Sequence, residues 1–83
     1  VDDSFKMLHE LEQKEIVLDT LAKLPETESL ILRLYYLDEN KIDEVSEISG
    51  LTQANVKVIL HRARLRFYKY LQASYKHEMN SLL

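Results

Sequence analysis

Residues 42–70 have the sequence IDEVSEISGLTQANVKVILHRARLRFYKY, which predicts a short helix, a tight turn at Gly50 and a longer helix that begins at Thr52. Gly50 is the only glycine in the chain, and glycine readily adopts the left-handed conformation that ends a helix sharply. Thr52 is a good N-cap, because its hydroxyl can accept a hydrogen bond from the first turn of the following helix. The stretch therefore predicts a helix-turn-helix, and its second helix is rich in cations: Lys57, Arg62, Arg64, Arg66 and Lys69.

Two further helices are expected before this stretch. Residues 4–24 predict a first helix with Ser4 as its N-cap, and Pro25 suits the first position of a second helix. The polar segment over residues 38–41 ends that second helix. Apolar side chains recur at intervals of three and four, so we expect the buried residues to be Phe5, Leu8, Leu11, Ile16, Leu18, Leu21 and Leu24 in the first helix, and Leu30, Ile31, Leu34 and Tyr35 or Leu37 in the second.

The third helix is expected over residues 41–49, with Asn40 as its N-cap and Asp43 as the acid of a capping box. Its apolar face should contain Ile42, Val45 and Ile48. The buried face of the fourth helix is expected to contain Val56, Leu60, Ala63, Phe67, Tyr70 and Leu71.

Length and composition favour one small all-α domain with four helices. The chain has 83 residues with one proline and one glycine, which is too little turn punctuation for a sheet protein. Cysteine is absent, and no apolar run approaches the length of a membrane span. We expect residues 1–12 to be a linker or the start of the first helix, 13–72 to be the domain, and 73–83 to be a helical extension or a frayed tail.

The charge is distributed unevenly, although the net charge is only −3. Residues 1–49 hold 13 acidic and 5 basic residues, whereas residues 50–83 hold 6 basic residues and 1 acidic residue. This asymmetry predicts a basic face that binds a polyanion. The acidic half either binds a different partner or is a solvated surface.

The exposed side of the fourth helix has the side chains that DNA recognition needs. Gln53 and Asn55 provide amides suited to adenine, and periodicity favours Gln53 as the one that points into the major groove. Cations that follow can neutralise phosphates. The candidate DNA contacts are Thr52, Gln53, Asn55, Lys57, Val58, His61, Arg62 and Arg64.

Other classes of site are not indicated. His9 has ligand-like spacing to Glu12 or Gln13, but no second pair completes a metal site, so we expect neither a metal nor a cofactor. No nucleophile, base and orienting group cluster in the sequence, so an enzyme is not expected.

At this point the sequence resembles a known family. Gly50-Leu51-Thr52, Val56-Lys57 and the run from Leu60 to Arg64 (Leu-His-Arg-Ala-Arg) are similar to the C-terminal region four of bacterial extracytoplasmic-function sigma factors. Upstream, Leu24-Pro25-Glu26 and the apolar run 31–36 look like the first half of the same region.

The resemblance implies a cytoplasmic domain that binds the promoter −35 element within RNA polymerase holoenzyme and also binds the flap of the polymerase β subunit. It implies an anti-sigma protein as a further partner and no contact with membrane. Arg64 and Arg66 are expected to serve phosphates or intramolecular pairs. The region that binds core polymerase and melts the −10 element is not in this sequence, so the chain is not expected to initiate transcription alone.

Some positions differ from the family pattern. Ile59 and Ser29 stand where the family usually has arginine, and Ser46 replaces the alanine where the two helices of the motif pack closest. We expect the Ser46 hydroxyl to bond back to a carbonyl. Two alternatives stay open: the output domain of another helix-turn-helix regulator, and a protein-interaction module that has lost DNA binding.

Overall fold

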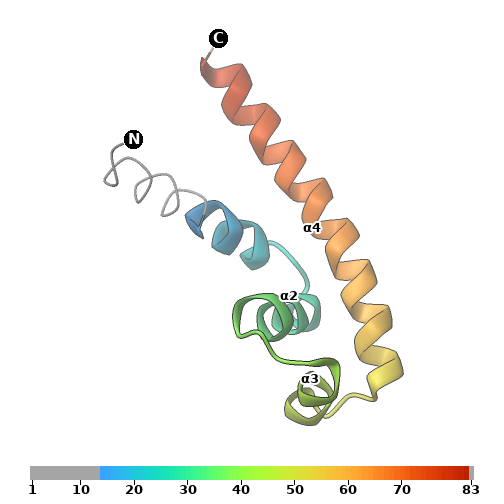
Figure 1. Cartoon of the computed structure of the whole chain (residues 1–83). Coiled ribbons are helices and arrows are strands. Elements are labelled where there is room, and N and C mark those ends of the chain that lie inside the picture. Colours follow the sequence, from blue (N-terminus) through green and yellow to red (C-terminus); the bar gives the residue numbers. More distant parts are fainter. Residues whose placement is uncertain (1–13, 83) are drawn as a thin grey trace.

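All regular structure in the described part of the chain is helical, which confirms the all-α prediction. The computed structural model describes the backbone of residues 14–82 and the side chains of residues 14–74. A first helix covers residues 14–22; α2 (Glu26–Leu32) continues into a π-helical turn, η1 (Arg33–Leu37); α3 (Ile42–Ser49) and α4 (Gln53–Leu82) follow (Figure 1). The expectations for Ser4, His9 and the rest of residues 1–13 lie outside the described residues.

The long helix α4 organises the packing. The first helix, α2 and α3 lie along one side of α4, and the C-terminal part of α4 extends past α2 and α3 (Figure 1). At 1.5 Å per residue, its 30 residues span about 45 Å. The core fills the space between α4 and the shorter helices, and it consists of Leu21, Leu24, Ile31, Leu32, Leu34, Val45, Val56, Leu60 and Ala63.

The turn between α3 and α4 has the predicted geometry. Gly50 is left-handed, with φ 76° and ψ 7°, and its N–H donates to the carbonyl of Ser46 at 3.0 Å. The Thr52 hydroxyl accepts a hydrogen bond from the backbone N–H of Asn55 at 3.1 Å. The Ser46 hydroxyl donates to the carbonyl of Leu51 across the turn, and not to a preceding carbonyl as expected. These bonds fix the angle at which α4 leaves α3.

Pro25 is the N-cap of α2 and not its first helical residue as predicted. Its ψ of 144° is extended, and its carbonyl accepts the bond from the backbone N–H of Ser29 at 2.9 Å. The proline ring also disfavours helical geometry at the preceding residue, Leu24. The first helix therefore ends at residue 22, two residues before the predicted end.

The N-cap predicted for α3 is also wrong. Lys41 occupies that position, and its N–H donates to Oε1 of Glu44 at 2.9 Å, so Glu44 replaces Asp43 as the reciprocal acid. Asn40 instead donates both its backbone N–H and its side-chain amide to the carbonyl of Leu34, each at 3.0 Å. Asn40 therefore satisfies the end of the preceding helix, where the widened η1 turn leaves the Leu34 carbonyl without a helical partner.

Three apolar residues predicted to be buried are exposed: Leu18, Leu30 and Ile48, with exposed fractions of 39%, 45% and 59%. Of the alternatives Tyr35 and Leu37, Tyr35 is the one that is partly buried against the core. Leu32 and Ser29 are buried in α2 instead of Leu30. In α3 the partly or fully buried row continues from Val45 to Ser49, which places Ile48 beside it in solvent.

Candidate nucleic-acid interface

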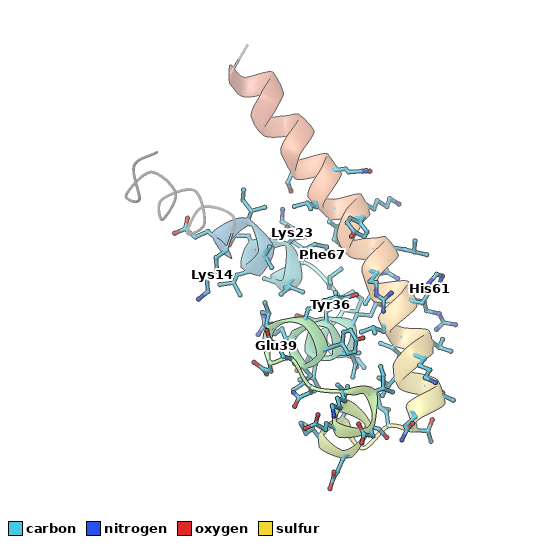
Figure 2. All side chains as sticks on the ribbon, in the orientation of Figure 1. Lys14, Lys23, Tyr36, Glu39, His61 and Phe67 are labelled. Atoms are coloured by element: carbon cyan, nitrogen blue, oxygen red, sulfur yellow. The ribbon has the colours of Figure 1, made fainter. Side chains whose placement is uncertain are left out.

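The N-terminal half of α4 presents the predicted DNA contacts to solvent. All eight candidate residues are exposed. Gln53, Lys57 and His61 follow one another at intervals of four, so they form one row along the helix. In Figure 2, His61 projects from the side of α4 that faces away from α2.

The other candidates lie beside this row or across the helix from it. Val58 and Arg62 form a neighbouring row, also at an interval of four. Asn55 is two residues from Gln53, which is a rotation of about 200° around the helix. Gln53 and Asn55 therefore cannot enter one groove together. The Thr52 hydroxyl is already engaged by the Asn55 N–H and serves as a cap.

The opposite face of α4 anchors these rows. Val56 and Ala63 are fully buried, and Leu60 is 2% exposed. A helix anchored by its opposite face needs no further ordering of its backbone on binding. The packing therefore fixes the face of α4 from which Gln53 and Lys57 project.

A second flank of α4 is tied to α2 by an ion pair. Nε of Arg66 donates to Oε1 of Glu28 at 2.9 Å. Hydrogen bonding with Tyr70 and the Glu28 carboxylate raise the pKa of Arg66, so the guanidinium stays charged. Arg66 thus has the intramolecular pair that the sequence analysis expected.

Ile59 and Ser29, which stand where the resemblance led us to expect arginine, both contribute to packing. Ile59 is partly buried and packs against the core, and Ser29 is 8% exposed within α2. An arginine at either position would point away from the exposed row of Gln53, Lys57 and His61. Their replacement leaves that row unchanged.

The two helices of the motif differ in charge. α3 exposes Asp43, Glu44 and Glu47, whereas α4 exposes the cations Lys57, Arg62, Arg64 and Lys69. A polyanion is therefore attracted to α4 and repelled from the exposed side of α3. The charge of the motif is therefore divided between its two helices, acidic on α3 and basic on α4.

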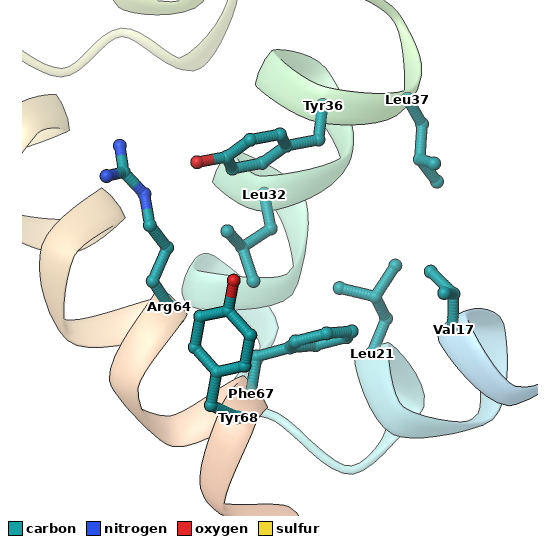
Figure 3. Close-up of a pocket in the computed structure, with 8 residues that line it drawn as sticks. All are labelled: Val17, Leu21, Leu32, Tyr36, Leu37, Arg64, Phe67 and Tyr68. Carbon is teal, nitrogen blue, oxygen red and sulfur yellow. The ribbon is translucent and has the colours of Figure 1, made fainter. Parts of the chain in front are cut away.

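An apolar groove of about 230 Å³ lies next to the basic rows, between the first helix, α2–η1 and α4 (Figure 3). Its lining comes from three separated segments and consists of Val17, Leu21, Leu32, Tyr36, Leu37, Arg64, Phe67 and Tyr68. In Figure 3 the Phe67 ring extends from α4 toward Leu21. The sequence pattern did not identify this groove, because Tyr36 and Tyr68 have the helical spacing of ordinary packing residues.

Arg64 lies at the edge of the groove and not in the first turns of α4. Its guanidinium carbon is 5.6 Å from the centre of the Tyr36 ring, within the range of a cation–π contact. Tyr36 also packs edge-on against Tyr35, with ring centres 4.9 Å apart. Arg64 therefore has an aromatic partner within the chain.

Two other kinds of site were searched for in the described residues. No group of three or more histidine, aspartate or glutamate side chains there could hold a metal ion. None of the described helices combines the length and the apolar character that a bilayer span requires.

Comparison with known proteins gives matches to one family. The model of "Sigma-70, region 4" matches residues 14–67. The extracytoplasmic-function RNA polymerase sigma factor SigM of Bacillus subtilis is 38% identical over 72 residues, which cover 87% of this chain and 42% of that protein. The RNA polymerase sigma factor FliA of Pseudomonas aeruginosa is 42% identical over 50 residues, 58% of this chain and 20% of that protein. The chain thus spans less than half the length of these relatives, and no solved structure matches it.

Proposed function

Because the chain belongs to the sigma-70 region 4 family, we propose that it binds the promoter −35 element as the C-terminal domain of an extracytoplasmic-function sigma factor in transcription initiation. The observation that carries the proposal is the exposed row of Gln53, Lys57 and His61 on a capped, core-anchored helix. The similarity to SigM supports the extracytoplasmic-function class.

In this proposal α4 enters the major groove with its N-terminal turns. The Gln53 amide bonds to a base edge, and Lys57 and Arg62 neutralise phosphates on either side. The unpaired N–H groups at the start of α4 face a further phosphate, as helix N-termini commonly do. The acidic side of α3 is directed away from the DNA, because repulsion from phosphate disfavours the reverse orientation.

The apolar groove serves a different partner. An apolar surface between helices, with half-exposed Tyr36 and Leu37 on one side and Tyr68 on the other, suits an amphipathic helix laid into it. We assign this groove to the β flap of core RNA polymerase in the cytoplasm. An anti-sigma protein would act by covering the same groove or the basic rows of α4.

The DNA assignment is tested by the salt dependence of binding. Fluorescence anisotropy of a labelled −35 duplex is measured from low to moderate salt for the wild-type chain, Lys57→Ala and Arg62→Ala. Each substitution should lower the slope of log K against log salt by about 1, because each removes one phosphate contact. Lys14→Ala, which removes an exposed cation from the first helix, should leave the slope unchanged.

A second measurement separates base reading from phosphate binding. Gln53→Ala should reduce the preference for the −35 duplex over a scrambled duplex and leave the salt slope unchanged, because the amide carries no charge. Binding without any salt dependence, by the chain and by its complex with polymerase, would contradict the DNA assignment. That result would favour the alternative function, a protein-interaction module that has lost DNA binding. The acidic surface of α3 is the observation that favours this alternative.

A further inference from the structure

Arg64 is the charged residue among the otherwise apolar and aromatic side chains that line the groove. It continues the row of Gln53, Lys57 and His61 at an interval of three, and Tyr68 follows at an interval of four. The row that begins at the DNA end of α4 therefore leads directly to the groove. Arg64 is the residue at which the two surfaces meet.

The position of Arg64 along α4 separates it from the DNA contacts. Arg64 is eleven residues beyond Gln53, which corresponds to about 16 Å along the helix axis. Helices of this motif read bases with their N-terminal turns. The cation–π contact with Tyr36 also draws the guanidinium toward α2–η1, on the groove side of α4 (Figure 3).

The Tyr36 contact leaves the hydrogen-bonding edge of Arg64 available. A guanidinium that lies over an aromatic face keeps its N–H groups in its own plane, where they can bind a carboxylate. Arg64 is exposed, and the ion pair found among the described side chains, Arg66–Glu28, does not involve it. A preoriented cation at the edge of an apolar groove complements a partner with an acidic group beside its apolar anchors.

We propose that Arg64 is a specificity residue of the groove, where it binds a carboxylate of an amphipathic helix from core RNA polymerase, and that it is not a phosphate contact. This inference rests on the proposed function, and it changes the role that the sequence analysis gave to Arg64. Tyr36 is the positioning residue, since its ring holds the guanidinium over the groove before the partner arrives.

The test compares two ligands and uses the chain with core RNA polymerase of Bacillus subtilis and with the −35 duplex. Arg64→Gln removes the charge and keeps most of the side-chain length. It should weaken polymerase binding about tenfold, as expected for loss of one charge-assisted pair, and should lower the salt dependence of that binding. The salt slope on DNA should not change.

Three variants complete the experiment. Arg62→Gln should lower the DNA salt slope by about 1, which reports on the proposed function independently. Tyr36→Ala should weaken polymerase binding and retain its salt dependence, because the charge is present but no longer held in place. Lys14→Gln removes an exposed cation of the first helix that does not line the groove, and it should change neither measurement.

Each contrary result has a distinct meaning. If Arg64→Gln lowers the DNA slope as Arg62→Gln does, Arg64 is a phosphate contact and the inference is wrong, although the proposed function stands. If sedimentation equilibrium shows a dimer that Arg64→Gln abolishes, a second copy occupies the groove and the inference is also overturned. If the wild-type chain binds neither ligand, the proposed function itself fails.

Discussion

Replacement of Gly50 by alanine tests the turn on which the interface depends. Gly50 has φ 76°, and a Cβ added there would meet no atom within 4 Å. The cost of Gly50→Ala is therefore the cost of the left-handed backbone and includes no steric clash. The turn cannot relax easily to another conformation, because the Gly50 N–H is bonded to Ser46 and the Ser46 hydroxyl is bonded to Leu51.

The magnitude follows from two opposing effects. The left-handed conformation destabilises the folded state by about 1–2 kcal/mol when the residue has a Cβ. Alanine also reduces the conformational freedom of the unfolded chain, which stabilises the folded state by about 0.4–1 kcal/mol. Gly50→Ala should therefore lower the free energy of unfolding by about 1 kcal/mol. Gly50→Asn should lower it less, since asparagine tolerates this conformation better.

Glu39 provides a control of opposite sign. Among the described residues, Glu39 is the one residue besides glycine that has a positive φ, with a value of 56°. Glu39→Gly relieves the same kind of backbone strain but increases the conformational entropy of the unfolded chain. It should therefore leave the free energy of unfolding unchanged or raise it by up to about 1 kcal/mol.

Urea unfolding followed by circular dichroism at 222 nm measures all three substitutions, with unchanged m-values required for the comparison. Gly50→Ala more stable than wild type would refute the left-handed turn. A loss above about 3 kcal/mol would show that the added methyl group meets other atoms, contrary to the open space around Gly50.

Three further side chains, each paired with a control substitution, test the packing and capping of the helices by urea unfolding. Leu60→Ala should destabilise the chain by about 2–5 kcal/mol, because the Leu60 side chain is 2% exposed. The control Leu65→Ala, on the same helix but 60% exposed, should change stability by less than about 0.5 kcal/mol. Equal effects of the two substitutions would contradict the packing of α4. Thr52→Ala should lower the free energy of unfolding by about 1 kcal/mol, because it removes the N-cap of α4. Thr52→Ser keeps the hydroxyl and should retain most of the stability. No effect of Thr52→Ala would mean that the Asn55 N–H finds another acceptor. Asn40→Ala should lower the free energy of unfolding by about 1 kcal/mol, because the Leu34 carbonyl loses its side-chain donor. Asn40→Asp should be no more stable than Asn40→Ala, because an aspartate side chain cannot donate a hydrogen bond at neutral pH. Recovery of stability with aspartate would instead indicate that residue 40 is an N-cap.

Features that depend on local chemistry were predictable from the sequence. The conformation of Gly50 and the cap at Thr52 follow from neighbours within five residues, so one stretch of chain specifies them. The buried face of α4 was also predictable, because the spacing of Val56, Leu60 and Ala63 fits one side of a helix that packs on one side only.

Features that depend on tertiary packing were not predictable. Asn40 is a good N-cap by residue type, but the carbonyl of Leu34 competes for it, and that carbonyl is free only because the helix widens at η1. Leu30 fits the apolar period of α2, yet α2 buries Leu32 and Ser29 instead. The groove is a similar case, since three segments must fold together before it exists.

The arrangement of α4 explains why two surfaces of different chemistry can lie on one small domain. The row that starts at Gln53 and reaches Tyr68 lies on one rigid helix, so the distance between the proposed DNA contacts and the groove is fixed by helix geometry. The Lys23 ammonium also donates to the Ser74 hydroxyl at 3.2 Å, which links the loop after the first helix to α4. A partner seated in the groove therefore sets the position of Gln53 and Lys57 relative to itself. The proposed DNA contact would then be strengthened by tethering, without any new bond to DNA.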